Sequence, residues 1–152
     1  HGTGRVFDTS LNEEGIIGRA VGMALAGLMP VPEIQFRKYA EPATEQINDC
    51  GTMRWRTANR FAAPMVLRIP GGFFKCGDPW HSQTNEVQFV HAPGWMVAAP
   101  SNAEDAVGLL RAALTAFDEL GDRYGEALEK GELKLTFDAE VEAFRVGNRK
   151  IR

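Results

Sequence analysis

Residues 10–28, SLNEEGIIGRAVGMALAGL, decide the fold, because they combine a helix start with an unusual number of small residues. Ser10 stands three residues before Glu13, which is the spacing of a capping box and predicts a helix over about residues 13–28. Four small residues fall on nearly one face of that helix: Gly15, Gly18, Gly22 and Ala26. Glycine costs about 1 kcal/mol per helical position relative to alanine, so this face indicates close packing against another backbone.

Strand-like and helix-like segments alternate on both sides of this stretch. Short extended or apolar runs at 5–8, 31–36, 64–70 and 95–99 predict strands, the last one buried. Amphipathic runs predict helices at about 42–59, 86–91 and 101–120, the last opened by a second capping box between Ser101 and Glu104. Gly27 is a stop signal for the first helix. This order predicts an α/β fold with an open parallel sheet and helices on both faces.

The last thirty or so residues follow a different pattern. Residues 123–130 could continue the preceding helix as a charged segment. Residues 133–137 and 141–146 alternate apolar and polar side chains, which predicts an antiparallel β-hairpin. We therefore expect two regions: an α/β domain over residues 1–120, incomplete at its N-terminus, and a divergent helix-and-hairpin tail over residues 121–152.

Composition narrows the possible functions. The chain has 152 residues, 44% apolar and 24% charged, with a formal net charge of −3. This is ordinary globular composition, and the small acidic excess does not favour a nucleic-acid or membrane surface. Two cysteines are too few for a disulfide scaffold and are typical of a reducing compartment. No secretory signal and no apolar run of membrane-spanning length is present, so an intracellular location is expected.

Several side chains could carry chemistry, and each has a structural alternative. Glu13 at a helix start could be a catalytic carboxylate or a helix cap. His81, in His81-Ser82-Gln83 after a glycine-bearing loop, could carry a proton or be simply solvated. Phe36 and Tyr39 follow a strand end and could contact a ligand or pack the junction. The histidines and cysteines lack zinc-ligand spacing, and no phosphate-binding loop is present.

Taken in order, the segments resemble a known domain. They are VFDTSLNEEGI at 6–16, VPEIQF at 31–36 with Tyr39, Pro42 and Gln46-Ile47 after it, His81-Ser82-Gln83, His91-Ala92-Pro93-Gly94, and PSNAEDAVGLL at 100–110. This set resembles the transketolase-like pyrimidine-binding domain of the beta subunits of pyruvate and branched-chain 2-oxoacid dehydrogenases, over about residues 5–117. The family signature, Glu-x4-Gly-x3-Gly, is matched by Glu13, Gly18 and Gly22.

The resemblance implies roles for individual residues. Glu13 would be catalytic and would hydrogen-bond the aminopyrimidine N1′ of thiamine diphosphate. His81 would be a second catalytic residue, involved with the substrate or intermediate and with acyl transfer to lipoyl. Further cofactor-binding positions are Tyr39, Glu33 and Phe36. The small residues Gly18, Gly22 and Ala26 would pack at a subunit interface. No metal ligand is expected within this chain.

The resemblance also implies partners. An alpha subunit would share the cofactor and hold its diphosphate and Mg²⁺, and a second beta subunit and a lipoyl acyltransferase core would complete a multienzyme complex. The chain would then support oxidative decarboxylation of a branched-chain 2-oxoacid or pyruvate, and would be inactive in isolation. Its location would be the bacterial cytoplasm, or the mitochondrial matrix in a eukaryote. The alternative is a truncated, non-catalytic interaction module that retains the fold.

Two departures from the family pattern stand out. Arg37-Lys38 replaces the commoner pair of a small and an acidic residue between the aromatic positions. After about Phe117 the likeness fades, and the lysine-bearing tail stands where the family continues its sheet.

Overall fold

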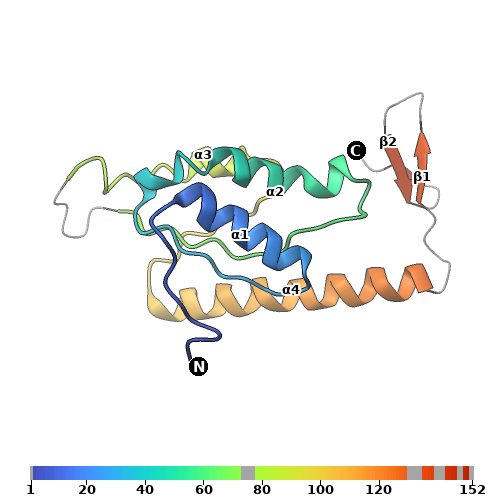
Figure 1. The fold of residues 1–152 in the computed structure, drawn as a ribbon, viewed down its shortest axis with the longest axis horizontal. Helices are drawn as coiled ribbons and strands as arrows, with labels where there is room; N and C mark the ends of the chain where they lie inside the picture. The colour runs from blue at the N-terminus through green and yellow to red at the C-terminus, as the bar shows by residue number, and fades with distance from the viewer. Residues whose placement is uncertain (1, 73–77, 130–134, 139–142, 147–148, 151–152) are drawn as a thin grey trace. The chain divides into compact units, whose positions relative to one another are not determined.

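The computed structural model describes residues 2–72, 78–129, 135–138, 143–146 and 149–150, shown as coloured ribbon in Figure 1. The chain divides into two compact units. One comprises His1–Thr52 with Ala62–Val97, and the other comprises Met53–Phe61 with Ala98–Arg152.

Helix α1 spans Glu13–Leu25, so the predicted helix is confirmed, but its cap was wrongly predicted. The N-cap is Asn12, whose side-chain oxygen accepts a hydrogen bond from the Gly15 backbone N–H at 3.0 Å. Asn12 has the extended backbone of a cap residue, and its amide oxygen satisfies one of the helix's unpaired N–H groups. Ser10 lies outside the helix, so the predicted capping box with Glu13 is not formed.

The end of α1 shows why glycine stands at position 27. Gly27 has a φ of +85°, a left-handed conformation that glycine adopts without steric cost. The chain turn it allows lets the Leu28 N–H donate to the Met23 carbonyl at 3.0 Å, which closes the helix end. The predicted stop signal is therefore confirmed, and the helix ends three residues before the predicted limit.

Segments 30–37 and 66–70 run parallel, as predicted for two neighbouring strands, yet they form only one β-bridge, between Glu33 and Arg68. The Ile34 N–H donates to the Arg68 carbonyl, and the Arg68 N–H to the Pro32 carbonyl, both at 3.0 Å. To continue the pairing toward the N-terminal ends of the two segments, the backbone of Pro32 would have to donate an N–H. To continue it toward their C-terminal ends, the backbone of Pro70 would have to donate one. Proline has no N–H, so the ladder is cut on both sides of the bridge.

Four further helical segments follow in the described residues. They are the 3₁₀ turn η1, Arg37–Ala40, and the helices α2, Thr44–Arg56, α3, Val87–Val90, and α4, Ala103–Glu129. All three α-helices were predicted, and α4 includes most of the charged continuation expected after residue 120. Its predicted capping box at Ser101 is wrong, because the Asn102 side chain accepts from the Asp105 N–H at 2.8 Å.

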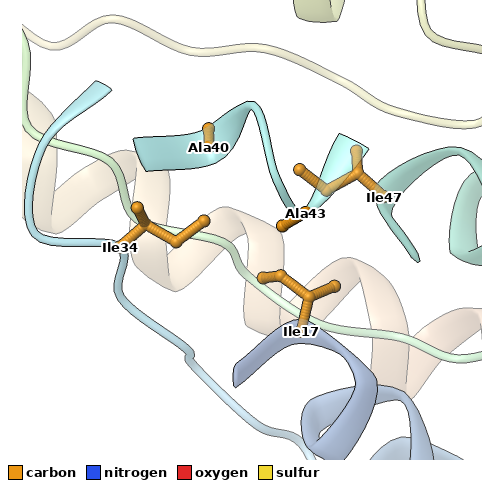
Figure 2. Packing of buried hydrophobic residues seen from close by; sticks show 5 residues of the cluster. All are labelled: Ile17, Ile34, Ala40, Ala43 and Ile47. Carbon is orange, nitrogen blue, oxygen red and sulfur yellow. The ribbon is translucent and has the colours of Figure 1, made fainter. Parts of the chain in front are cut away.

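The core of the first unit gathers side chains from α1, η1, α2 and the segment before η1 (Figure 2). Its fully buried members are Ile17, Ile34, Ala40, Ala43 and Ile47. The core face of α1 is made by Ile17, Ala20 and Ala24, which recur at helical spacing. Core packing therefore determines how α1 is rotated and which of its faces is left outward.

Helix α2 and the segment 93–95 approach each other very closely. A Cβ on Gly51 would lie 2.2 Å from the Pro93 carbonyl oxygen, and Gly94 has a φ of +82°. The Trp95 indole N–H donates to the Ile47 carbonyl at 2.8 Å and holds the two segments together. Both glycines are needed because a side chain at either position would meet backbone atoms.

The predicted buried strand 95–99 is not formed. Met96 is 91% exposed, and residues 96–100 have no strand assignment and no backbone hydrogen bond to another described residue. An apolar segment becomes a buried strand only when neighbouring strands pair with it, and no described segment does so. Of residues 5–8, also predicted to be extended, Arg5 lies in a turn, where its N–H donates to the Gly2 carbonyl at 3.1 Å, and none of the four is assigned to a strand.

In the tail, β1, Leu135–Asp138, pairs antiparallel with β2, Ala143–Val146, and β2 pairs with β3, Arg149–Lys150. The two alternating segments thus lie side by side in the register of a hairpin, with Phe137 opposite Phe144. The residues between them lie outside the described part of the chain. The described helices include none that is both long and apolar enough to cross a lipid bilayer.

Candidate active site

Three predicted site residues meet in one aromatic cluster, which consists of Phe36, Tyr39 and His81. The His81 ring lies edge-on to both others, with centroid distances of 5.1 Å to Phe36 and 5.4 Å to Tyr39. The Tyr39 hydroxyl and His81 Nε2 are 2.9 Å apart, a hydrogen-bonding distance. The turn η1 brings Tyr39 back toward Phe36, so residues from two distant segments form one surface.

Behind the cluster lies Asp78, which the sequence analysis did not identify. Its Oδ2 is 2.9 Å from His81 Nδ1, and Trp80 donates its backbone N–H to Oδ1 at 2.7 Å. The pKa of the Asp78 carboxyl lies below its ordinary value, mainly because of the Trp80 hydrogen bond and then because of His81. The Asp-x-x-His spacing was a usable signal, since a turn can bring residues i and i+3 together.

Arg37 and Lys38, which depart from the family pattern, each contact neighbouring side chains. Arg37 is 4% exposed and donates its guanidinium hydrogens to the side-chain oxygens of Asn85 and Gln88, with Glu41 at 3.4 Å. These partners offset the cost of burying a charge and tie η1 to the segment that leads into α3. Lys38 instead places its Nζ 3.7 Å above the Trp80 ring, a cation–π contact.

The two acidic residues predicted to contact the cofactor lie in different surroundings. Glu13 is half-buried in the first turn of α1, four residues before Ile17 and on the same side of the helix. Its carboxylate makes no hydrogen bond or ion pair with any described residue. Glu33 is exposed and forms an ion pair with Arg68 at 3.0 Å. Neither carboxylate is bonded to the aromatic cluster.

The small-residue face of α1 points away from the core. Gly18, Gly22 and Ala26 are all exposed, and a Cβ built on either glycine would meet no described atom within 4 Å. The close packing predicted for this face is therefore not made within the described chain.

The Cys50 thiol is buried. Burial raises the pKa of the Cys50 thiol to about 11, and its Sγ donates to the Ala63 carbonyl at 3.3 Å. Among the residues that the structure describes, no three His, Cys, Asp or Glu side chains gather closely enough to hold a metal ion.

Comparison with known proteins identifies the family of the chain. Residues 1–120 match the family described as the pyrimidine-binding domain of transketolase. The chain belongs to this family of pyrimidine-binding domains. Within it, the chain is similar to the beta subunits of 2-oxoacid dehydrogenases, as its resemblance in sequence implied.

Three relatives illustrate the similarity. The beta subunit of 2-oxoisovalerate dehydrogenase from Pseudomonas aeruginosa is 46% identical over 115 residues, which are 75% of this chain and 33% of the relative. The pyruvate dehydrogenase E1 component subunit beta from Acholeplasma laidlawii is 44% identical over 115 residues, 75% of this chain and 35% of the relative. The mitochondrial 2-oxoisovalerate dehydrogenase subunit beta from Dictyostelium discoideum is 37% identical over 153 residues, 99% of this chain and 39% of the relative.

The chain thus spans between 33% and 39% of the length of these relatives. The region that matches the family, residues 1–120, contains the aromatic cluster and α1, and the relatives are much longer than this chain.

Proposed function

We propose that the chain is the pyrimidine-binding half of a thiamine-diphosphate-dependent 2-oxoacid dehydrogenase beta subunit. It would support oxidative decarboxylation of a branched-chain 2-oxoacid or pyruvate and acyl transfer to lipoyl. The observation that carries this proposal is the cluster of Phe36, Tyr39 and His81, joined by a 2.9 Å hydrogen bond in a chain of this family.

The residues present fit a flat, nitrogen-containing ring. Phe36 and Tyr39 offer aromatic surfaces, and Glu13 offers a half-buried carboxylate that no described residue engages. A carboxyl group can hold a proton at a ring nitrogen, which is the role proposed for Glu13. Thiamine diphosphate, when bound, supplies a nucleophilic carbon and an electron sink for decarboxylation. Glu33 is proposed as a further contact and would have to exchange its Arg68 partner for the cofactor.

His81 is proposed to act on the substrate side of the same site. Its imidazole is about one-quarter exposed, and Tyr39 and Asp78 hold its two ring nitrogens. A histidine held in this way can move a proton during acyl transfer, because one ring nitrogen can accept a proton while the other donates one.

The rest of the site would come from other chains. An alpha subunit is proposed to hold the diphosphate and Mg²⁺, as the resemblance to the beta subunits of 2-oxoacid dehydrogenases implies. A second beta subunit is proposed to cover Gly18, Gly22 and Ala26, where the bare helix surface permits close backbone approach. A lipoyl acyltransferase core is the proposed acceptor of the acyl group.

Calorimetry with thiamine diphosphate and Mg²⁺ tests the shared site. We expect binding to the chain mixed with an alpha subunit and none to the chain alone. Tight binding to the chain alone would contradict the sharing of the site. A stable complex that never binds the cofactor would instead favour the non-catalytic interaction module.

Glu13→Gln tests the catalytic role, with Glu14→Gln as a matched control in the same helical turn. In the assembled enzyme, Glu13→Gln should lower decarboxylation by about 10²–10⁴-fold, the range for a lost acid–base group. Glu14 is exposed, and its substitution should leave the rate nearly unchanged. An unchanged rate for Glu13→Gln, with circular dichroism intact for both variants, would remove Glu13 from the mechanism.

A further inference from the structure

We propose that Asp78 is a positioning residue that holds the His81 imidazole with its proton on Nδ1, so that Nε2 accepts a hydrogen bond from Tyr39. The geometry itself stands without any assumption about function. Its consequence for catalysis rests on the proposed function, in which His81 takes part in acyl transfer.

Asp78 is held in place by its own turn before it meets His81. Its Oδ1 accepts the Trp80 N–H at 2.7 Å, and its backbone carbonyl accepts the Ser82 N–H at 3.2 Å. Its other carboxylate oxygen, Oδ2, then lies 2.9 Å from His81 Nδ1. Both carboxylate oxygens are engaged, so the carboxylate has a defined orientation toward the ring.

The hydrogen-bonding capacity of each group determines where the proton lies. A carboxylate can only accept, so the His81 nitrogen that faces Asp78 must carry hydrogen. A neutral imidazole has one N–H, which leaves Nε2 as an acceptor for the Tyr39 hydroxyl, 2.9 Å away. With a neutral His81, the chain Asp78–His81–Tyr39 therefore has one proton arrangement in which both contacts are hydrogen bonds.

The charged groups around the ring are consistent with this arrangement. The pKa of Asp78 lies below its ordinary value, first because of the Trp80 N–H and then because of His81, so Asp78 is ionised at neutral pH. On the other side, Lys38 Nζ lies 3.7 Å from the Trp80 ring centroid and 5.4 Å from that of Tyr39. Phe36 packs edge-on to the imidazole, with ring centroids 5.1 Å apart.

Asp78 would affect the reactivity of His81 as a carboxylate does when it accepts a hydrogen bond from a catalytic imidazole. It keeps Nε2 unprotonated, so that this nitrogen can accept a proton, and it stabilises the positive ring that then forms. Asp78 would thus act through His81, on the face that Tyr39 and Phe36 border.

Nuclear magnetic resonance of the full chain labelled with ¹⁵N-histidine tests the geometry directly. The chain has three histidines, His81 is assigned with His81→Gln, and exposed His91 is the internal control. Wild-type His81 should show the Nδ1–H tautomer. Asp78→Asn keeps an oxygen for the Trp80 N–H but offers an amide hydrogen to Nδ1, so the Nε2–H tautomer should increase. An unchanged His81 tautomer in Asp78→Asn and Asp78→Ala would overturn the proposal.

Kinetics of the enzyme assembled with its alpha subunit test the consequence. Asp78→Asn should lower acyl transfer at least about tenfold, a part of what an acid–base group contributes. In a His81→Gln background the same change should cause no further loss, because a positioning residue acts only through its partner. Equal losses in both backgrounds would indicate a merely structural role. If His81→Gln itself left the rate unchanged, the proposed function would fail while the tautomer result stood.

Discussion

Helices α1 and α2 both carry glycine in their interiors, but the two sets of glycine have opposite surroundings. Gly51 of α2 faces the backbone of residues 93–95, where an added Cβ would lie 2.2 Å from a carbonyl oxygen. Gly18 and Gly22 of α1 face no described atom within 4 Å. Because glycine weakens a helix wherever it stands, the contact at Gly51 explains its presence, whereas no contact with a described residue explains the α1 glycines, for which we propose a subunit interface.

The largest expected effect is on the alkylation rate of Cys50. This rate tests whether the buried side of α2 stays inaccessible to reagents. Cys50, next to Gly51, has a pKa raised to about 11 by burial, against an ordinary 9.0. At about pH 8 its thiolate is roughly a hundredfold scarcer than in an unfolded chain, so alkylation should slow by at least that factor. Mass spectrometry of the Cys50 peptide, with and without urea, measures this ratio.

The sign of the pH dependence follows from the same shift. A raised pKa favours the protonated thiol in the folded state, so this contribution to stability is complete below the unfolded value of 9.0. It should decrease as the pH rises toward about 11. Equal alkylation rates in folded and unfolded chain would mean that α2 opens readily.

Gly51→Ala attacks the same contact by substitution. The new methyl group would meet the Pro93 carbonyl and the Trp95 ring, so the free energy of unfolding should fall by about 1–3 kcal/mol. Urea denaturation followed by circular dichroism measures the change. A variant as stable as wild type would show that the close approach of α2 to residues 93–95 is not part of the fold.

Asn12→Ala tests the start of α1 and distinguishes the observed cap from the predicted one. Loss of the bond to the Gly15 N–H should reduce the free energy of unfolding by about 1 kcal/mol. Ser10→Ala is the matched control and should change stability by only a few tenths of that. If thermal denaturation showed that Ser10→Ala lowers stability more than Asn12→Ala does, Ser10 would be the cap.

Gly22→Ala should have the smallest effect and the opposite sign to Gly51→Ala. Alanine is the better helix former and meets no described atom here, so the isolated chain should gain about 0.5–1 kcal/mol. The same variant should associate less with its beta partner in analytical ultracentrifugation if this face is the proposed interface. Destabilisation of the isolated chain would indicate that the face already packs within it.

The helices could be predicted from sequence because their signals are local. Apolar spacing, the small-residue face and Gly27 located α1, α2, α3 and α4. The caps could not be distinguished, since Ser10 and Asn12 are both good cap residues and only the backbone conformation of Asn12 decides between them. That the Glu13 carboxylate bonds no described residue could likewise not be read from its sequence neighbours.

What the sequence determined by itself is the family and the order of its elements, because the matching segments keep their order along the chain. What only the tertiary structure decided depends on contacts between distant residues. These include the hydrogen bond between Tyr39 and His81 and the contact of the Asp78 carboxylate with His81. They also include the register of the two paired segments, which places Pro32 and Pro70 where a backbone N–H would be needed to extend the pairing. Such contacts arise from folding of the backbone across many residues, so no local pattern specifies them.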